Sequence, residues 1–470
     1  MRYIAILAFF WFSLSGSAQI KPLLYNVDDL PQTLRSNPGA EIKFKGHIGI
    51  PFLSGIHFNA GFTGVSVYDI FRNDDNSDIN DRVRNAIRDM THTDYFSLNE
   101  QLDIFSVGWK INRRDYLSAG IYQELDVFSY FPKDLAILAN EGNNDYIGVP
   151  FDFSQISLTG EIITVYHVGL NRKVSNRLTV GGRLKLYAGV FNVQSTNNTG
   201  FFTTVRTPDG PNVFRHYAEN LDVLINTSGF ASLNDKEDMT VEEGLKELLS
   251  RSLLGGNVGA GLDLGFTYAV NEQFKVTGAV EDIGIMLQER DVENYHYYGS
   301  YQTDGLEPLF PDLDTKDKAI PYWDIFENEV DKNLTDETLH QRYVTWRPYK
   351  FHTSMQFGFG RAFMPCNYRI VSKPRFLNLV GMQLSGVNRP KGLVYNLTAY
   401  YDRKFAEHQR IRFAYTLDDY SFTNLGLMYS STFKKFNFYL AANNLLALPN
   451  LAKARGFSLQ VGMQIIFEGL

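Results

Sequence analysis

The chain has 470 residues, a formal net charge of −7 and a single cysteine, and it includes 27 Tyr and 36 Phe. The lone Cys366 excludes an internal disulfide framework, and the acidic balance gives no indication of nucleic-acid binding. Many aromatic residues at modest mean hydropathy are typical of membrane β-barrels, whose strands face lipid on one side and water on the other.

The N-terminus has the pattern of a secretory signal peptide over residues 1–18. Arg2 precedes an apolar run from Ile4 to Leu14, and Gly16-Ser17-Ala18 offers small residues for cleavage. The run is too short to cross a bilayer as a helix, and no later run reaches about 18 apolar residues. We therefore expect an exported chain. Residues 19–40 would form a periplasmic segment or a plug inside a barrel built from 41–467.

Fourteen segments are predicted as strands because apolar and polar residues alternate along them. In one of the clearest, Leu178, Val180 and Leu184 alternate with Thr179 and Arg183. The segments are 41–70, 96–110, 115–129, 157–171, 178–193, 257–269, 274–284, 349–362, 375–388, 393–403, 409–418, 421–431, 436–444 and 456–467.

The connections between these segments alternate in length. Long ones cover 71–95, 130–156, 194–256 and 285–348, and tight ones lie between them. Long extracellular loops facing short periplasmic turns indicate an all-β fold, an antiparallel transmembrane β-barrel of 14 strands in the bacterial outer membrane with periplasmic termini. Pro51 interrupts the first segment, but two strands there would make fifteen and break the even number, so we expect one long strand bent at Pro51. A barrel of 16 strands is the alternative. The loops are predicted to be partly helical.

The last segment resembles the closing-strand signal of outer-membrane barrels. Gln460, Gly462, Ile465 and Phe467 match its polar, glycine, apolar and aromatic positions, although three residues follow Phe467 here. The resemblance implies that the barrel-assembly machinery is a partner during insertion. The alternative is an amphipathic edge strand of a soluble sheet.

Inward positions of the predicted strands carry charged side chains, namely Lys43, Lys45, His47, Arg183, Lys185, Asp263 and Glu281. Charges in a lumen must be paired, so a hydrogen-bonded network that stiffens the barrel is one interpretation. A ladder that guides a substrate is the other.

The connection 285–348 is strongly acidic, with fourteen Asp or Glu against six Lys or Arg. Such charge keeps a loop solvated. It would also suit divalent-cation bridges to lipopolysaccharide, beside the general contact with membrane lipid, or a basic protein partner at the extracellular loops.

Asp74, Asn76 and Asp78 place oxygen ligands on alternate residues, as a calcium loop does, but the glycine and distant glutamate of an EF-hand are missing. The alternative is that Ser77 or Asp78 caps a helix whose apolar face includes Ile87 and Met90. No other metal or cofactor pattern and no catalytic motif is present, so the sequence predicts no cofactor and no enzyme activity.

Asn37-Pro38-Gly39 before the first strand, together with the fourteen strands, resembles the fatty-acid-transporter (FadL-like) superfamily, which carries Asn-Pro-Ala near this point. That superfamily includes the PorV-type subunits of the type IX secretion system. The chain is more similar still to an uncharacterised family of Bacteroidota outer-membrane proteins. This similarity lies in 37–41, in Gly49 to Gly55, in Phe131 to Leu135 and in Glu141 to Asn143.

Two functions remain open at this point. The PorV-type resemblance implies an accessory or partner-binding subunit of a surface or secretion complex, and the charged, partly helical loops favour it slightly. The FadL-like resemblance implies uptake or binding of hydrophobic small molecules, captured among apolar loop residues and released through a lateral opening.

Overall fold

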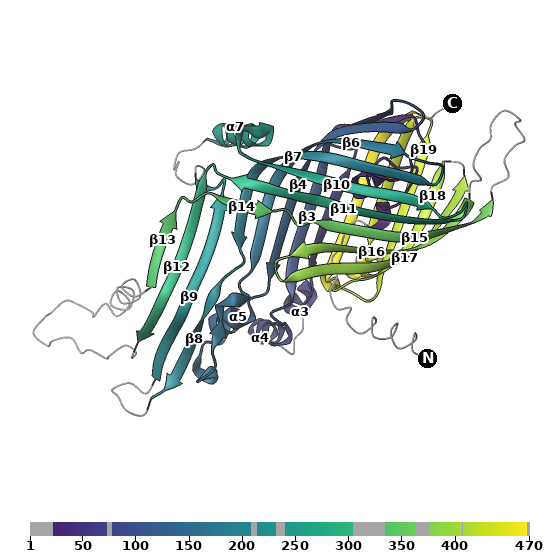
Figure 1. Ribbon diagram of the computed structural model, residues 1–470. Helices are drawn as coiled ribbons and strands as arrows, with labels where there is room; N and C mark the ends of the chain where they lie inside the picture. Colours follow the sequence, from purple (N-terminus) through teal and green to yellow (C-terminus); the bar gives the residue numbers. More distant parts are fainter. Residues whose placement is uncertain are drawn as a thin grey trace, which may run out of the picture.

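A computed structural model describes residues 22–72, 78–207, 214–231, 240–303, 334–361, 376–406 and 408–467. They form a closed antiparallel barrel, with a smaller group of strands standing beyond one rim (Figure 1). None of the helices in these residues is both long and apolar enough to cross a membrane.

The barrel wall has fourteen strand positions within the described residues, and neighbouring positions are antiparallel. In chain order they are β1 (Gly46–Gly49) with β2 (Ile56–Phe62), β3 (Tyr95–Lys110), β4 (Asp115–Tyr130), β6 (Leu158–Lys173), β7 (Leu178–Ser195), β10 (Asn257–Ala269), β11 (Phe274–Gln288), β15 (Lys350–Arg361), β16 (Phe376–Arg389), β17 (Gly392–Ala406), β18 (Gln409–Leu417), β19 (Asn424–Phe433), β20 (Phe436–Asn443) and β21 (Gly456–Phe467). A short strand, β14 (Tyr343–Trp346), pairs with β11 beyond β15. The ring closes where β21 pairs with β1 and β2, so the predicted fold class is confirmed.

The first wall position is shared by two short strands. Both β1 and β2 pair with β21 on one side and with β3 on the other, so together they fill one place in the ring. Residues 50–55 between them leave both ladders. The wall therefore has fourteen positions rather than sixteen, although the strand is interrupted around Pro51 and begins at Gly46 rather than at residue 41.

Alternation along each strand separates an oily outer surface from a polar interior. In β21, Leu459 and Met463 are exposed on the outside, whereas Gln460 and Gln464 are buried inside. Other strands add exposed apolar side chains to this outer surface, among them Val168, Leu184, Leu264, Met355, Phe413 and Leu440. A closed sheet with an apolar outside and a polar inside is the architecture of an outer-membrane barrel.

Four further strands extend the structure beyond the long-loop end, at the left of Figure 1. They are β8 (Thr199–Arg206), β9 (Phe214–Ser228), β12 (Val292–Thr303) and β13 (Leu334–Leu339), paired in that order, and β9 also pairs with the end of β7. The sequence predicted partly helical loops; α7 (Val241–Ser250) lies in one of these stretches, and they also contain strands that the sequence did not predict. Register shifts at Gly200 and Gly299 break their alternation, which is why a period of two did not reveal them.

Short helices cover the long-loop end. They are α3 (Val67–Phe71), α4 (Ile79–Asp89) and α5 (Lys133–Asn140), with the turns η2 (Asn144–Tyr146) and η3 (Phe153–Gln155) and the short strand β5 (Phe151–Asp152). Ile87, Met90, Ile137 and Phe151 pack there into one buried cluster. The remaining helical elements are η1 (Pro22–Leu24), α2 (Thr33–Ser36), α7 (Val241–Ser250), η4 (Arg251–Gly255) and η5 (Leu445–Lys453).

Candidate functional site

Residues 22–40 lie inside the barrel and occupy its lumen. Leu23, Tyr25, Val27 and Leu30 have no solvent exposure. The leucines and Val27 pack against inward side chains of β17 to β20, namely Tyr400, Ala414, Met428, Tyr439 and Ala441. We call residues 22–40 the lumen segment. Its apolar residues have the burial of a protein core, so the segment is packed and not merely enclosed.

Two aspartates anchor the lumen segment electrostatically. Asp28 pairs with Lys43 and with Arg410 at 2.6 Å, and Asp29 pairs with Lys404 at 2.6 Å. Burial raises the pKa of the Asp28 carboxyl, but Lys43, Lys404 and Arg410 outweigh it and hold that pKa well below its usual range. Both carboxylates therefore stay charged at neutral pH, as their cations require.

Two buried arginines hold the backbone of the lumen segment. Arg412 donates to the carbonyls of Leu23 at 3.0 Å and Tyr25 at 2.7 Å, and Asp402 accepts two bonds from the same guanidinium. Arg183 donates to the carbonyl of Arg35 at 2.5 Å while it is paired with Asp263 at 2.5 Å. A planar guanidinium holds five donors in a fixed fork, so it can bind a carboxylate through two bonds and still donate to backbone carbonyls.

The Asn37-Pro38-Gly39 turn wedges the end of the lumen segment against the wall. A Cβ at Gly39 would lie 2.3 Å from the carbonyl oxygen of Gly265, and one at Gly181 would lie 2.0 Å from that of Pro38. Asn171 donates to the carbonyls of Pro38 at 2.7 Å and Ala40 at 2.9 Å. Glycine is needed on both surfaces because the backbones touch.

An ion network crosses the lumen between the segment and the long-loop end. Lys185 pairs with Asp263 at 3.0 Å and Asp282 at 2.5 Å, and Lys350 joins Asp282 to Glu124 at 3.1 and 3.0 Å. Further pairs link His352 with Glu281, Arg347 with Glu124 and Glu161, and Arg389 with Asp126. The partners come from opposite parts of the wall, so the network braces the barrel across its width.

Six of the seven charged residues predicted for the lumen lie there or at its mouth. Arg183, Lys185, Asp263 and Glu281 belong to the ion network, Lys43 holds Asp28, and His47 is buried beside the Tyr116 hydroxyl at 2.5 Å.

Lys45 is the exception. It is exposed, and its ammonium lies over the ring of Trp109 on the outer surface, at 5.6 Å. The regular strand begins only at Gly46, so the alternation that places His47 inside does not extend back to Lys45. The prediction for this residue was wrong.

Several members of the network were missed from sequence, including Glu124, Asp126, Asp282 and Arg347. Asp282 lies at an irregularity in the β10–β11 pairing and has a positive φ of 59°, so two successive residues, Glu281 and Asp282, are both buried. Strict alternation would have sent one of them outward.

The residues of the closing-strand pattern divide between the two faces of β21. Gln460 and Gly462 are buried inside, and Ile465 and Phe467 face outward. The Phe467 ring lies 5.1 Å from that of Trp109, in an aromatic group near the short turns. Their interaction with the assembly machinery stays a prediction.

Asp74 and Asn76 of the calcium hypothesis lie outside the described residues. Asp78 occupies the N-cap position of α4 and accepts a bond from the Asn80 amide at 3.0 Å. Ala86, Ile87 and Met90 are buried, so the predicted amphipathic helix is confirmed. The part of the chain that the structure describes holds no group of three or more His, Cys, Asp or Glu suited to a metal.

Three small cavities lie around Arg35 of the lumen segment. The largest, about 60 Å³, faces the long-loop end and is lined partly by Tyr95, Tyr122, Phe128 and Tyr420. Two others, each about 20 Å³, lie against the interrupted first wall position, one beside Gly55 and Ile56 and one beside His47 and Ser106. Arg35 lines all three and pairs with Asp103 of β3.

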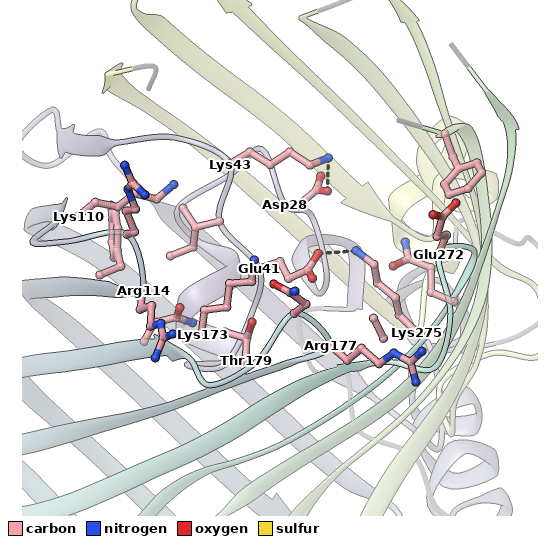
Figure 2. A pocket seen from close by; sticks show the side chains of 18 of the residues that line it. Asp28, Glu41, Lys43, Lys110, Arg114, Lys173, Arg177, Thr179, Glu272 and Lys275 are labelled. Carbon is pink, nitrogen blue, oxygen red and sulfur yellow. Dashed lines mark hydrogen bonds and ion pairs between the residues drawn. The ribbon is translucent and has the colours of Figure 1, made fainter. Parts of the chain in front are cut away.

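A much larger cavity, about 690 Å³, opens at the short-turn end. We call it the basin. Figure 2 shows Lys110, Arg114, Lys173 and Arg177 around it, and the Lys43–Asp28 and Lys275–Glu41 pairs beside them. The lumen segment separates the basin from the cavities around Arg35.

Solved structures that resemble this chain include toluene transporters and a FadL homologue. A Ralstonia pickettii toluene transporter, TbuX, is 10% identical, with a TM-score of 0.40 over 94% of this chain and 95% of that one. A Pseudomonas aeruginosa FadL homologue is 9% identical, with a TM-score of 0.40 over 96% and 97%. A Pseudomonas putida toluene transporter, TodX, is 12% identical, with a TM-score of 0.37 over 97% and 96%.

No curated protein matches this chain. A family model matches residues 38–443, from the turn that follows Asn37 to the end of β20. The chain therefore belongs to DUF5723, a family of unknown function.

Proposed function

We propose that this barrel takes up small lipophilic molecules from the outer surface and releases them sideways through its wall at residues 50–55. The observation that carries the proposal is the contact between this interruption of the wall and the lumen segment. Gln32 donates to the carbonyl of Ser54 at 2.6 Å, and Arg35 pairs with Asp103 beside it. A shift of the lumen segment would therefore break contacts at residues 50–55, where the wall is interrupted.

The interruption is sealed by few hydrogen bonds. The backbone N–H of Met463 donates to the carbonyl of Leu53 at 2.7 Å, and the backbone N–H of Asp103 donates to that of Gly55 at 2.8 Å, where a regular strand would continue both ladders. Phe52 is 55% exposed and has a φ of 61°, a conformation that is strained for a bulky residue. Strain of this kind is often found in segments that move.

The cavities around Arg35 mark the route in its closed state. The largest is lined by four aromatic rings, whose faces suit a lipophilic molecule, together with charged side chains of the ion network. One of the smaller cavities reaches Gly55 in the interruption, and the other lies beside it against β1 and β3. At about 20 Å³ each, the smaller ones are too narrow for such a molecule. Passage thus requires the Arg35–Asp103 pair to part.

The test is transfer of a fluorescent fatty-acid analogue into liposomes that contain the full chain. Arg35→Gln should raise the transfer rate roughly tenfold, because a charge-assisted hydrogen bond contributes about 1.5–3 kcal/mol to the closed state. Arg35→Gln with Asp103→Asn removes the pair without leaving a buried charge and should behave alike.

Arg88→Gln is the matched control, since it removes an arginine from an exposed pair with Glu141 in the loops. It should leave transfer at the wild-type rate. If neither the wild type nor the Arg35 variants transfer the probe faster than empty liposomes, the proposal fails.

A second function, that of an accessory subunit in a surface complex, is favoured by the strands beyond the rim. The sheet β8–β9–β12–β13 ends at β13, which pairs only with β12 among the described residues. Tyr297 on β12 is 45% exposed. The test is purification of the chain from its native outer membrane, where a partner should be recovered in equal amounts. Tyr297→Asp should lose this partner, and Lys434→Gln, at the opposite end, should keep it. That result would favour this function over passage.

Both functions share one placement, with the short-turn end and the termini in the periplasm and the long loops outside. The same proposal includes export by the predicted signal peptide 1–18 and insertion by the barrel-assembly machinery. It also includes contact of the acidic loop with lipopolysaccharide. The placement follows the usual asymmetry of loop lengths in such barrels. Protease added to whole cells should therefore cut the loops and spare the short turns.

A further inference from the structure

The basin at the short-turn end is framed by the turns that join neighbouring strands. Residues 111–114 join β3 to β4, residues 174–177 join β6 to β7, and residues 270–273 join β10 to β11. At about 690 Å³ its volume falls within the 300–1,000 Å³ typical of pockets for small ligands. Basic side chains outnumber acidic ones in its lining (Figure 2).

The carboxylates of the basin are engaged with cations or other partners. Glu41 pairs with Lys275 at 2.5 Å, and Asp115 holds Arg172 through two bonds of 2.6 and 2.9 Å. Asp28 is held by Lys43 and Arg410, and Glu272 also has an interaction partner. These acids neutralise the cations that face them.

Five further cations of the lining have no ion pair with any carboxylate of the described residues. They are Lys110, Arg113, Arg114, Lys173 and Arg177, from two adjacent turns and the strand ends beside them. Lys110 and Lys173 are close enough for their charges to repel each other. Figure 2 shows Lys110, Arg114 and Lys173 gathered on one side of the cavity. Like charges held together in a concave site create a strong attraction for an anion.

We propose that the basin binds a ligand that carries several phosphate groups. Arginine forks and lysine ammonium groups are the side chains that recognise phosphate, and a phosphate group brings up to two negative charges in a small volume. Two or three such groups would balance the five free cations. The ligand is either the headgroup of an anionic phospholipid or a soluble polyphosphorylated compound. The site stands apart from the proposed passage, because the lumen segment lies between them.

The first experiment measures binding of tripolyphosphate to the full chain in neutral detergent by titration calorimetry. Lys110→Gln with Lys173→Gln should weaken binding roughly tenfold or more, which corresponds to about 1.4 kcal/mol. Both changes relieve repulsion, so the variant is expected to fold. Binding should also weaken as salt rises, because ions screen charges over about 10 Å at 0.1 M.

Lys434→Gln with Lys435→Gln is the matched control. It removes the same charge from another turn at the same end, where both lysines lie over the outward rings of Phe433 and Phe467. The control should bind as the wild type does. Equal weakening in both double variants, or no binding by the wild type, would overturn the proposal.

A second arm identifies the source of the phosphate. The chain is placed in nanodiscs of neutral lipid with or without anionic phosphatidylglycerol, and tripolyphosphate binding is measured in each. If a lipid headgroup fills the basin, phosphatidylglycerol should lower the apparent affinity for tripolyphosphate in the wild type. If the affinity is unchanged, the ligand is soluble.

Discussion

At the scale of single residues, the lumen is stabilised by charges that share partners. The Arg412 guanidinium serves Asp402 and the carbonyls of Leu23 and Tyr25, and it lies 4.2 Å from the centre of the Tyr400 ring. An isolated buried charge would be costly, and each shared bond offsets part of that cost. Because these bonds share partners, docking of the lumen segment depends on whether its own carboxylates are protonated.

Protonation of Asp28 should loosen the lumen segment. Its carboxyl has a lowered pKa in the docked segment, so it stabilises docking above the ordinary pKa, near 4, and loses that contribution as pH falls. We expect lower protection factors, that is, exchange rates closer to the intrinsic rate at the same pH, for the amides of residues 23–34 below about pH 4. Asp28→Asn should show the same loss of protection at pH 7, by about 2 kcal/mol.

Asp145→Asn, a change in an exposed loop turn, serves as the control and should leave the exchange of the lumen segment unaltered. Equal protection factors at pH 7 and pH 3 would show that apolar packing alone holds the segment.

At the scale of elements, α7 and η4 lie on the outside of the wall next to β7 (Figure 1). The buried Arg251 fastens them by donating to the carbonyls of Val190 and Gly229 and pairing with Asp291 at 2.8 Å. Leu245, Leu249, Leu253 and Leu254 are nevertheless exposed, beside a wall whose outer face is itself apolar. A helix with such a face lies stably at a lipid surface.

We therefore expect Leu249 to contact lipid in the membrane. An environment-sensitive fluorophore attached at Leu249→Cys, in a chain with Cys366→Ser, should shift its emission to the blue in liposomes and be quenched by brominated acyl chains. The same label at Lys246→Cys, on an exposed position of the same helix, should respond less. Equal responses at the two positions would contradict a lipid-facing leucine side.

At the scale of the whole molecule, the barrel depends on one seam. β21 must pair with β20 on one side and with the two halves of the first position on the other. A sheet that fails to close leaves unpaired backbone groups in lipid, which costs several kcal/mol for each group. Closure is thus the step at which the fold becomes stable in the membrane.

Phe467→Ala should impair this closure more than the same substitution at another outward aromatic residue. It removes the ring that contacts Trp109 and Lys435 at the end of the seam, and it also alters the predicted assembly signal. We expect less folded barrel in the outer membrane, measured as the fraction that resists protease. Phe438→Ala, an outward aromatic on β20, is the control, and an equal loss there would deny Phe467 a special role.

The sequence by itself determined the repeating local pattern of this protein. Alternation such as Leu459 outside and Gln460 inside depends only on the two-residue period of a strand, so strand number, the oily band and the inward positions of Arg183, Lys185 and Asp263 could be predicted. The amphipathic helix that contains Ile87 could be predicted for the same reason, since its pattern is local.

Only the tertiary structure decided what lies across the lumen. Partners such as Arg410 and Asp28, or Lys350 and Glu124, are distant in sequence, and their meeting depends on strand register across long connections. The outer strands and the outward Lys45 were missed because bulges and irregular backbone break the period. A closed barrel brings such distant positions together, and that closure is a property of all its strands at once.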